Sequence, residues 1–381
     1  MRNRPRPTHP VATDPTRVDP AQLAANPHIP SSAEPPRCYH RQFASLPGNR
    51  WYKPIFVAVL TAVFYLVALV AEFAGFFVWA LLTRGADSDF DAWSEILVDM
   101  NTTTGVLFGL VSVILMWPAA ELAAFCIYRR WFSSLISLRG GMRLRLLGRY
   151  MLYGTAVWAV CAIVMVLFSD GAMGTLTSGI VWNQHVLAML VLVILLIPLQ
   201  ATAEEVVFRG MAMNVIGAWL RHPAWAVLIP VPFFVFGHMY DLPGLIDVGI
   251  FAVIVGTLTI ITGGLEAGIA FHIVNNLFAF ALGVLAGADL NATSPPTIEV
   301  VMSIAAPIVF AVIVVLDHPR RGGNCPHRGG LPDREPLRSG RVGPEHRGAG
   351  PDRPAKAETD TRASLYELLQ RTRPEPAPAR L

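Results

Sequence analysis

Two adjacent glutamates and an arginine stand in the stretch ATAEEVVFRG, residues 201–210, directly after the apolar run VLAMLVLVILLIPLQ. A charge at membrane depth costs about 3 kcal/mol on insertion scales, so such a residue is expected to have a partner and a function. On a helix, Glu205 and Arg209 are four residues apart and share a face, which predicts an ion pair. Glu204 lies about 100° around the helix from Glu205. The stretch therefore predicts one neutralised carboxylate and a second one that faces elsewhere.

Two histidines and an asparagine follow on later apolar segments. His238 ends the stretch FFVFGH, and the stretch FHIVNN places His272 and Asn276 four residues apart, on one helical face. Polar side chains within a membrane turn toward the interior of the helix bundle and toward one another. We therefore expect Glu204 and these three residues to surround one wet pocket. Taken singly, each has a plainer explanation, such as a wetted helix end or a histidine bonded to a neighbouring carbonyl.

These residue types suit the hydrolysis of a peptide bond by water. A glutamate shielded from bulk water can take a proton near neutral pH, and a histidine beside it can orient the attacking water. An imidazole N–H and an asparagine carboxamide supply two donors for the developing oxyanion. The same set suits zinc, because two histidines and one carboxylate leave a coordination position open for water. The residue types leave the two mechanisms open.

The composition defines the elements that must position these side chains. Of the 381 residues, 53% are hydrophobic and 15% are charged, and the mean hydropathy is +0.47, values that exclude the soluble class. A membrane helix needs roughly 20 mainly apolar residues. Eight such runs predict an all-α polytopic membrane bundle of about eight transmembrane helices, at approximately 55–82, 105–127, 151–168, 186–208, 223–240, 245–262, 264–287 and 299–316.

The charged residues alternate between the connections of these runs. Arginines and lysines collect before the first run, between the second and third, and after the eighth, whereas acidic residues dominate the intervening connections. By the positive-inside rule, this alternation predicts that both termini are cytoplasmic. Only two of the 30 basic residues are lysines, Lys53 and Lys356, a bias typical of a GC-rich bacterial genome. We therefore expect an integral protein of a bacterial plasma membrane.

The ends of the chain differ in composition from the middle. Residues 1–50 and 318–381 are rich in proline and arginine without a hydrophobic period, which predicts two disordered cytoplasmic tails. The transmembrane domain lies between them, at 51–317, and its motifs lie within 198–280. The lipid bilayer is its expected surrounding. No stretch of interleaved basic and aromatic residues indicates nucleic acid.

One spacing conflicts with these boundaries. A straight helix over 223–240 would place His238 roughly 22 Å from its start, whereas Glu204 lies near the end of the run 186–208. Prolines within the former run could break the helix and bring the two closer. We favour a second explanation, in which the helix that carries Glu204 continues through MAMNVIGAWL, an apolar segment without a breaker.

Together, the three motifs resemble those of the CPBP intramembrane protease family, also called the Abi or type II CAAX prenyl endopeptidase family. The family pattern is E-E-x-x-x-R, then F-x-x-x-H, then H-x-x-x-N or D, on successive membrane helices. Here the pattern reads Glu204-Glu205-x-x-x-Arg209, Phe234-x-x-x-His238 and His272-x-x-x-Asn276. The similarity covers about 198–280 and includes a glycine-rich approach to the third motif.

The resemblance implies an eight-helix bundle with a water-filled cavity, partly open to lipid, and an endopeptidase acting on a membrane-associated peptide or protein. It implies that Glu204 activates water with help from His238, that His272 and Asn276 stabilise the oxyanion, and that Glu205 and Arg209 hold the geometry. The family has been described both as metal-dependent and as glutamate-dependent. Zinc bound by Glu204, His238 and His272 therefore stays an alternative.

Two other functions stay open. A transporter or proton-relay protein would use the acids and histidines as a translocation path, but it predicts paired broken helices, and the sequence shows one cluster. A non-catalytic immunity or scaffold member of the same fold would keep the bundle without turnover. Every motif position is filled, which favours the protease.

Overall fold

The computed structural model describes residues 38–84, 90–131, 136–168, 182–293 and 297–318. The elements of these stretches are helices, and one isolated antiparallel bridge joins Ser137 to Gly264. The predicted all-α class is therefore confirmed. The C-terminal tail from residue 319 onward and residues 1–37 of the N-terminal tail lie outside the described residues.

Seven spans in the described stretches are long and apolar enough to cross a membrane. Many of their large apolar side chains are exposed, as expected for helices whose outer faces are solvated by lipid. These features indicate an integral membrane protein. The spans are Lys53–Thr83, Thr103–Tyr128, Leu144–Phe168, Gln184–Gly217, Leu242–Thr262, Glu266–Ala286 and Thr297–Asp317.

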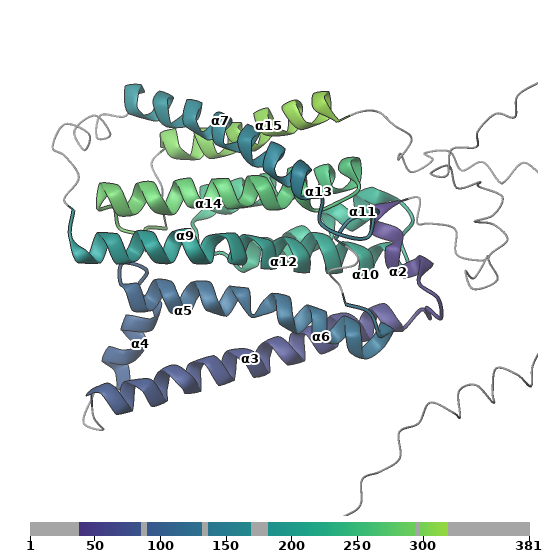
Figure 1. Cartoon of the computed structure of the whole chain (residues 1–381), viewed down its shortest axis with the longest axis horizontal. Helices are drawn as coiled ribbons and strands as arrows, with labels where there is room; N and C mark the ends of the chain where they lie inside the picture. The colour runs from purple at the N-terminus through teal and green to yellow at the C-terminus, as the bar shows by residue number, and fades with distance from the viewer. Residues whose placement is uncertain (1–37, 85–89, 132–135, 169–181, 294–296, 319–381) are drawn as a thin grey trace, which may run out of the picture. The chain divides into compact units, whose positions relative to one another are not determined.

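The described helices follow one another along the chain as labelled in Figure 1, where η1 is a 3-10 helix and η3 is a π-helix. They are η1 (Tyr39–Arg41), α2 (Gln42–Ser45), α3 (Lys53–Arg84), α4 (Phe90–Val98), α5 (Thr103–Ile114), α6 (Met116–Tyr128), α7 (Leu144–Phe168), α9 (Gln184–Glu204), η3 (Glu205–Ala212), α10 (Met213–Gly217), α11 (Pro223–Leu228), α12 (Pro230–Phe236), α13 (Leu242–Thr262), α14 (Glu266–Ala286) and α15 (Thr297–Asp317).

The predicted run 223–240 does not form one long helix. It folds into α11 and α12, which are separated at Ile229, and the following residues up to Asp241 are not helical. Pro230 has no N–H group to continue the hydrogen bonds of α11, and this explains the break. Two short helices over 223–236 span about 21 Å, less than the roughly 30 Å of a hydrocarbon core. This segment is therefore the fifth of the eight apolar runs of the sequence, and its helices are shorter than a full span.

The span that carries Glu204 continues to Gly217, as the favoured explanation of the sequence predicts. It consists of α9, η3 and α10 in one unbroken helical path. Glu204 ends α9 and lies about 20 Å from the end of the span, at 1.5 Å per residue. The glutamate pair is thus placed within the span rather than at its end.

Helix α14 lies between α7 and α9 and packs against both (Figure 1). On the α7 side, Gly154 lies against Phe271 and Val274, whose side chains would be in ordinary contact with an added Cβ, at 3.5–3.6 Å. Small residues allow membrane helices to approach closely in this way. The opposite side of α14 faces α9, and this contact carries His272 and Asn276.

Both ends of α14 are anchored. At its start, the buried Glu266 accepts hydrogen bonds from Arg143 Nε at 2.9 Å and from Arg143 Nη2 at 2.6 Å. Beyond its end, the segment Asp289–Asn291 pairs with the segment Asp99–Asn101, which precedes α5. These contacts limit sliding and rotation of the helix.

The two Asp-x-Asn segments form a reciprocal clasp. Asn101 Nδ2 donates to Asp289 Oδ1 and Asn291 Nδ2 donates to Asp99 Oδ1, each at 2.7 Å. These hydrogen bonds lower the pKa of both aspartates, and the largest cause is the asparagine of the opposite segment in each case. The clasp connects the start of α5 to the end of α14.

The N-terminal segment 38–45, predicted as part of a disordered tail over 1–50, packs against α10 instead. Its Tyr39, His40, Gln42 and Phe43 are buried. The backbone N–H of Gln42 donates to Asn214 Oδ1 at 2.9 Å, and Arg41 Nη1 donates to the Gly217 carbonyl at 2.7 Å. A Cβ at Gly217 would collide with the His40 carbonyl. The described fold thus includes residues before position 51. The sequence did not indicate this, because a few specific contacts are invisible in the average composition of the segment.

Candidate active site

Glu205 on η3 contacts both Arg209 of the same helix and His272 of α14. Its Oε1 accepts a hydrogen bond from Arg209 Nη1 at 3.0 Å and lies 2.8 Å from His272 Nδ1. The exposed fractions of the three residues are 0%, 3% and 3%. Since an ionised carboxylate only accepts, Nδ1 of the ring is the donor. The ion pair expected from the four-residue spacing is present.

Glu204 faces the other nitrogen of the same ring. Its Oε2 lies 3.3 Å from His272 Nε2, a distance typical of an ion pair, although the angle does not make a hydrogen bond. The exposed fraction of Glu204 is 7%. Consecutive glutamates therefore lie against the two nitrogens of a single buried imidazole.

The cluster holds more acidic than basic side chains. Two glutamates and one guanidinium surround one buried imidazole, and these side chains have little access to bulk water. Uncompensated negative charge is costly inside a protein, so the imidazole that lies against both carboxylates is central to the electrostatics of the site.

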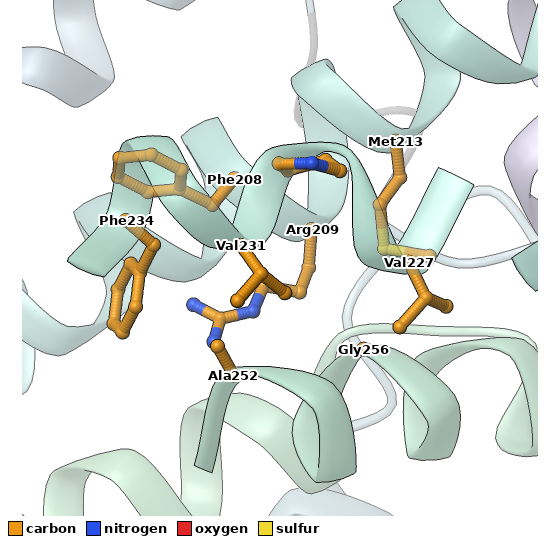
Figure 2. Close-up of a pocket in the computed structure, with 9 residues that line it drawn as sticks. Phe208, Arg209, Met213, Val227, Val231, Phe234, Ala252 and Gly256 are labelled. Carbon is orange, nitrogen blue, oxygen red and sulfur yellow. The ribbon is translucent and has the colours of Figure 1, made fainter. Parts of the chain in front are cut away.

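The Arg209 guanidinium is enclosed by aromatic rings. Its Cζ lies 4.2 Å from the centroid of the Phe234 ring and 5.7 Å from that of Phe251, both within cation–π range. Figure 2 shows it at a pocket lined by Phe208, Arg209, Met213, Val227, Pro230, Val231, Phe234, Ala252 and Gly256. Apolar walls strengthen the Glu205–Arg209 interaction, because they exclude water.

His238 lies beside this cluster rather than in it. Its Nδ1 donates to the Phe234 carbonyl at 2.8 Å, which leaves the lone pair on Nε2. The Phe234 ring centroid is 4.8 Å from that of His238 and 6.3 Å from that of His272. Within the described part of the chain, no hydrogen bond or ion pair joins His238 to Glu204.

Asn276 is held by a residue that the motifs do not include. Its Nδ2 donates to Gln200 Oε1 at 3.0 Å, and its Oδ1 accepts from Asn275 Nδ2 at 3.1 Å. Gln200 is one helical turn before Glu204 on α9. The position of a polar residue four before the glutamate, on the same face, is the signal that could have indicated it.

The glycine-rich approach to the third motif is explained by a close helix contact. A Cβ at Gly268 would lie 2.7 Å from Glu205 Oε2 and from Val255 Cγ1. Gly268 is one turn before His272, and Asn276 is one turn after it. One face of α14 therefore meets Glu205, Glu204 and Gln200 in succession.

The π-helix η3 begins at Glu205, directly after Glu204. π-helical segments within α-helices are frequently found at functional sites. Here the change of helix type falls between the two glutamates, at the point where they lie against opposite nitrogens of His272. The sequence predicted a continuous helix through this region but did not indicate the π-turn.

The predicted zinc ligands fit a metal ion only in part. In a tetrahedral site, two ligands about 2.0–2.1 Å from one zinc ion are roughly 3.3 Å apart, similar to the Glu204–His272 separation. Among the described residues, however, no group of three His, Cys, Asp or Glu side chains has a metal-binding arrangement. His238 would have to move to complete the set.

The fold and site together define a polytopic membrane protein with a buried glutamate–histidine cluster between two of its spans. Residues 183–278 match the family model of the type II CAAX prenyl endopeptidase Rce1-like proteins, so this part of the chain is a domain of that family. The match contains all six predicted site residues and confirms the resemblance. It implies an intramembrane CAAX-type protease. No curated protein and no solved structure matches the chain.

Proposed function

We propose that the protein is a glutamate-dependent intramembrane endopeptidase that hydrolyses a peptide bond in a membrane-associated substrate. The observation that supports this proposal best is the placement of His272 between Glu205, 2.8 Å from Nδ1, and Glu204, 3.3 Å from Nε2. Such an arrangement orients the ring and leaves Glu204 as the carboxylate available for proton transfer.

In the proposed mechanism, Glu204 accepts a proton from a water molecule as the water oxygen forms a bond to the peptide carbonyl carbon. The carbonyl oxygen becomes an oxyanion, which a doubly protonated His272, through its Nε2–H group, and the free Nδ2 hydrogen of Asn276 stabilise. His238 offers the lone pair of Nε2 to orient the water. Glu204 then returns the proton to the amide nitrogen, the oxyanion re-forms the carbonyl group as the C–N bond breaks, and a carboxylic acid and an amine leave.

The roles of Glu205 and Arg209 are structural in this proposal. Glu205 fixes the donor at His272 Nδ1, and Arg209 balances its charge. Zinc on Glu204, His238 and His272 would instead activate the water as a Lewis acid. The orientation of the ring favours the mechanism without metal, because both nitrogens of His272 already lie against a carboxylate oxygen.

The substrate that the family name suggests is a peptide with a prenylated C-a-a-X terminus, anchored in lipid. We propose that it reaches the site from the membrane. His238 is one of the non-helical residues between α12 and α13, and irregular backbone at membrane depth is stable next to protein or a water-filled cavity.

The function can be tested with the purified full chain in lipid nanodiscs. Prenylated and unmodified C-a-a-X peptides are incubated with the wild type and with a Glu204→Ala, His272→Ala double variant, and the products are identified by mass spectrometry. Two complementary fragments from the wild type alone would support the proposal. Intact peptide with a folded wild type, across a library of membrane-anchored peptides, would favour a non-catalytic member of the same fold.

A further inference from the structure

Gln200 is a buried polar residue on a membrane helix, outside the three family motifs. It lies on α9, four residues before Glu204, and its exposed fraction is 6%. Residues four apart share a helical face, so Gln200 and Glu204 both face α14. A polar side chain at this depth is stable only with a hydrogen-bond partner and is a candidate for function.

The partner of Gln200 is the proposed oxyanion donor. Gln200 Oε1 accepts from Asn276 Nδ2 at 3.0 Å, while Asn275 Nδ2 donates to Asn276 Oδ1 at 3.1 Å. A carboxamide has two N–H donors and one carbonyl oxygen. With its oxygen and one hydrogen held, the second Nδ2 hydrogen of Asn276 points in one fixed direction.

The same two helices meet again one turn away. Glu204 faces His272 on the turn next to the Gln200–Asn276 pair, so α9 and α14 run antiparallel and contact through two successive pairs. In both pairs the proposed oxyanion donor is on α14 and the residue that faces it is on α9. Oxyanion stabilisation depends on donors fixed before the reaction, because free rotation would have to be stopped at the transition state.

We propose that Gln200 is a positioning residue of the active site, which aims the Asn276 carboxamide at the oxyanion. The inference rests on the proposed function, and it adds a residue that the family motifs do not contain. Gln200 acts through Asn276 and does not contact the reacting atoms.

The main test is Gln200→Met, which keeps the length of the side chain and removes the acceptor. With a cleaved peptide in nanodiscs, kcat should fall by up to about 100-fold, the loss expected when a catalytic group is misplaced by about 1 Å. KM and the melting temperature should stay close to those of the wild type. Leu199→Met is the matched control, because the exposed Leu199 side chain lies on the same turn, and its kcat should be unchanged.

A double-variant cycle tests whether Gln200 acts through Asn276. Asn276→Ala should lower kcat by about 100-fold or more, the loss typical of one oxyanion donor. Adding Gln200→Met to Asn276→Ala should then have little further effect, because the residue to be positioned is gone. Losses that multiply would overturn the inference, and so would a Gln200→Met variant with the kcat of the wild type.

Gln200→Glu keeps the test decisive if the methionine variant does not fold. A carboxyl oxygen still accepts from Asn276, but its charge opposes the oxyanion once it ionises. The kcat of this variant should therefore fall as pH rises, through an ionisation absent from the wild type, and a profile identical to the wild type would contradict the inference. The proposed function fails separately, when Asn276→Ala itself cleaves at the wild-type rate.

Discussion

His272 Nδ1 lies 2.8 Å from Glu205 Oε1, and this carboxylate has no exposed surface. Because Glu205 can only accept, the contact fixes the donor on Nδ1 and turns Nε2 toward Glu204, 3.3 Å away. One buried hydrogen bond thus sets both the orientation of the ring and the different roles of two adjacent glutamates.

Glu205→Gln should destabilise the protein and lower its activity. The substitution leaves the Arg209 charge buried without its partner, and breaking a buried ion pair typically costs about 3–5 kcal/mol. The free energy of unfolding can be measured by denaturant titration in mixed micelles. Asp317→Asn is the matched control, because it removes the exposed Arg149–Asp317 pair and should change stability little. Equal effects of the two substitutions would contradict the role of Glu205.

Gly268→Ala should disturb the site through a single methyl group. The added Cβ would lie 2.7 Å from Glu205 Oε2, so α14 must shift or Glu205 must turn. Overpacking of this kind costs about 1–3 kcal/mol, and kcat should fall as His272 loses its orientation. Gly75→Ala on α3 provides the comparison, since nothing lies within 4 Å of its added Cβ. A Gly268→Ala variant with wild-type stability and kcat would show that this helix contact is not critical.

Acidification should weaken the clasp between Asp99–Asn101 and Asp289–Asn291. The pKa of both aspartates is lowered in the folded protein, so their contribution to stability is complete above about pH 4, the range of the unfolded pKa. The contribution is lost as pH falls through the lower folded pKa. Melting temperatures from pH 7 to pH 2 should therefore fall more for the wild type than for an Asp99→Asn, Asp289→Asn variant. Parallel curves would contradict this account.

Chelation should leave the activity intact. The proposed mechanism moves protons between water, Glu204 and the leaving amine, and it uses no metal ion. After dialysis against a strong zinc chelator, the rate of peptide cleavage and the metal content should be measured on the same sample. A loss of activity that stoichiometric zinc restores would contradict the metal-free mechanism.

Residue spacing predicted the local parts of this site. The i, i+4 spacing of Glu205 and Arg209 indicated their ion pair, and the absence of a breaker in MAMNVIGAWL indicated that the span of Glu204 continues to Gly217. Both features depend on contacts or breaks within a few residues along one helix. Such features follow from helix geometry alone.

Contacts between helices could not be predicted in the same way. The pairing of Gln200 with Asn276 depends on the rotation and depth of α9 against α14, which hydropathy does not encode. The packing of Tyr39 and Phe43 under α10 was hidden by a proline-rich and arginine-rich composition. The π-helix that begins at Glu205 likewise has no periodic signal in the sequence.

The most direct test of the account compares the Glu204→Gln and Glu72→Gln variants under single-turnover conditions. Both remove a carboxylate from a membrane helix, but Glu72 lies on α3 and its two buried oxygens have no partner among the described residues. With a cleaved peptide in nanodiscs, Glu204→Gln should lower the cleavage rate by about 10²- to 10⁴-fold, the usual contribution of a general base, and Glu72→Gln should cleave at nearly the wild-type rate. A Glu204→Gln variant that cleaves as fast as the wild type would contradict the central claim.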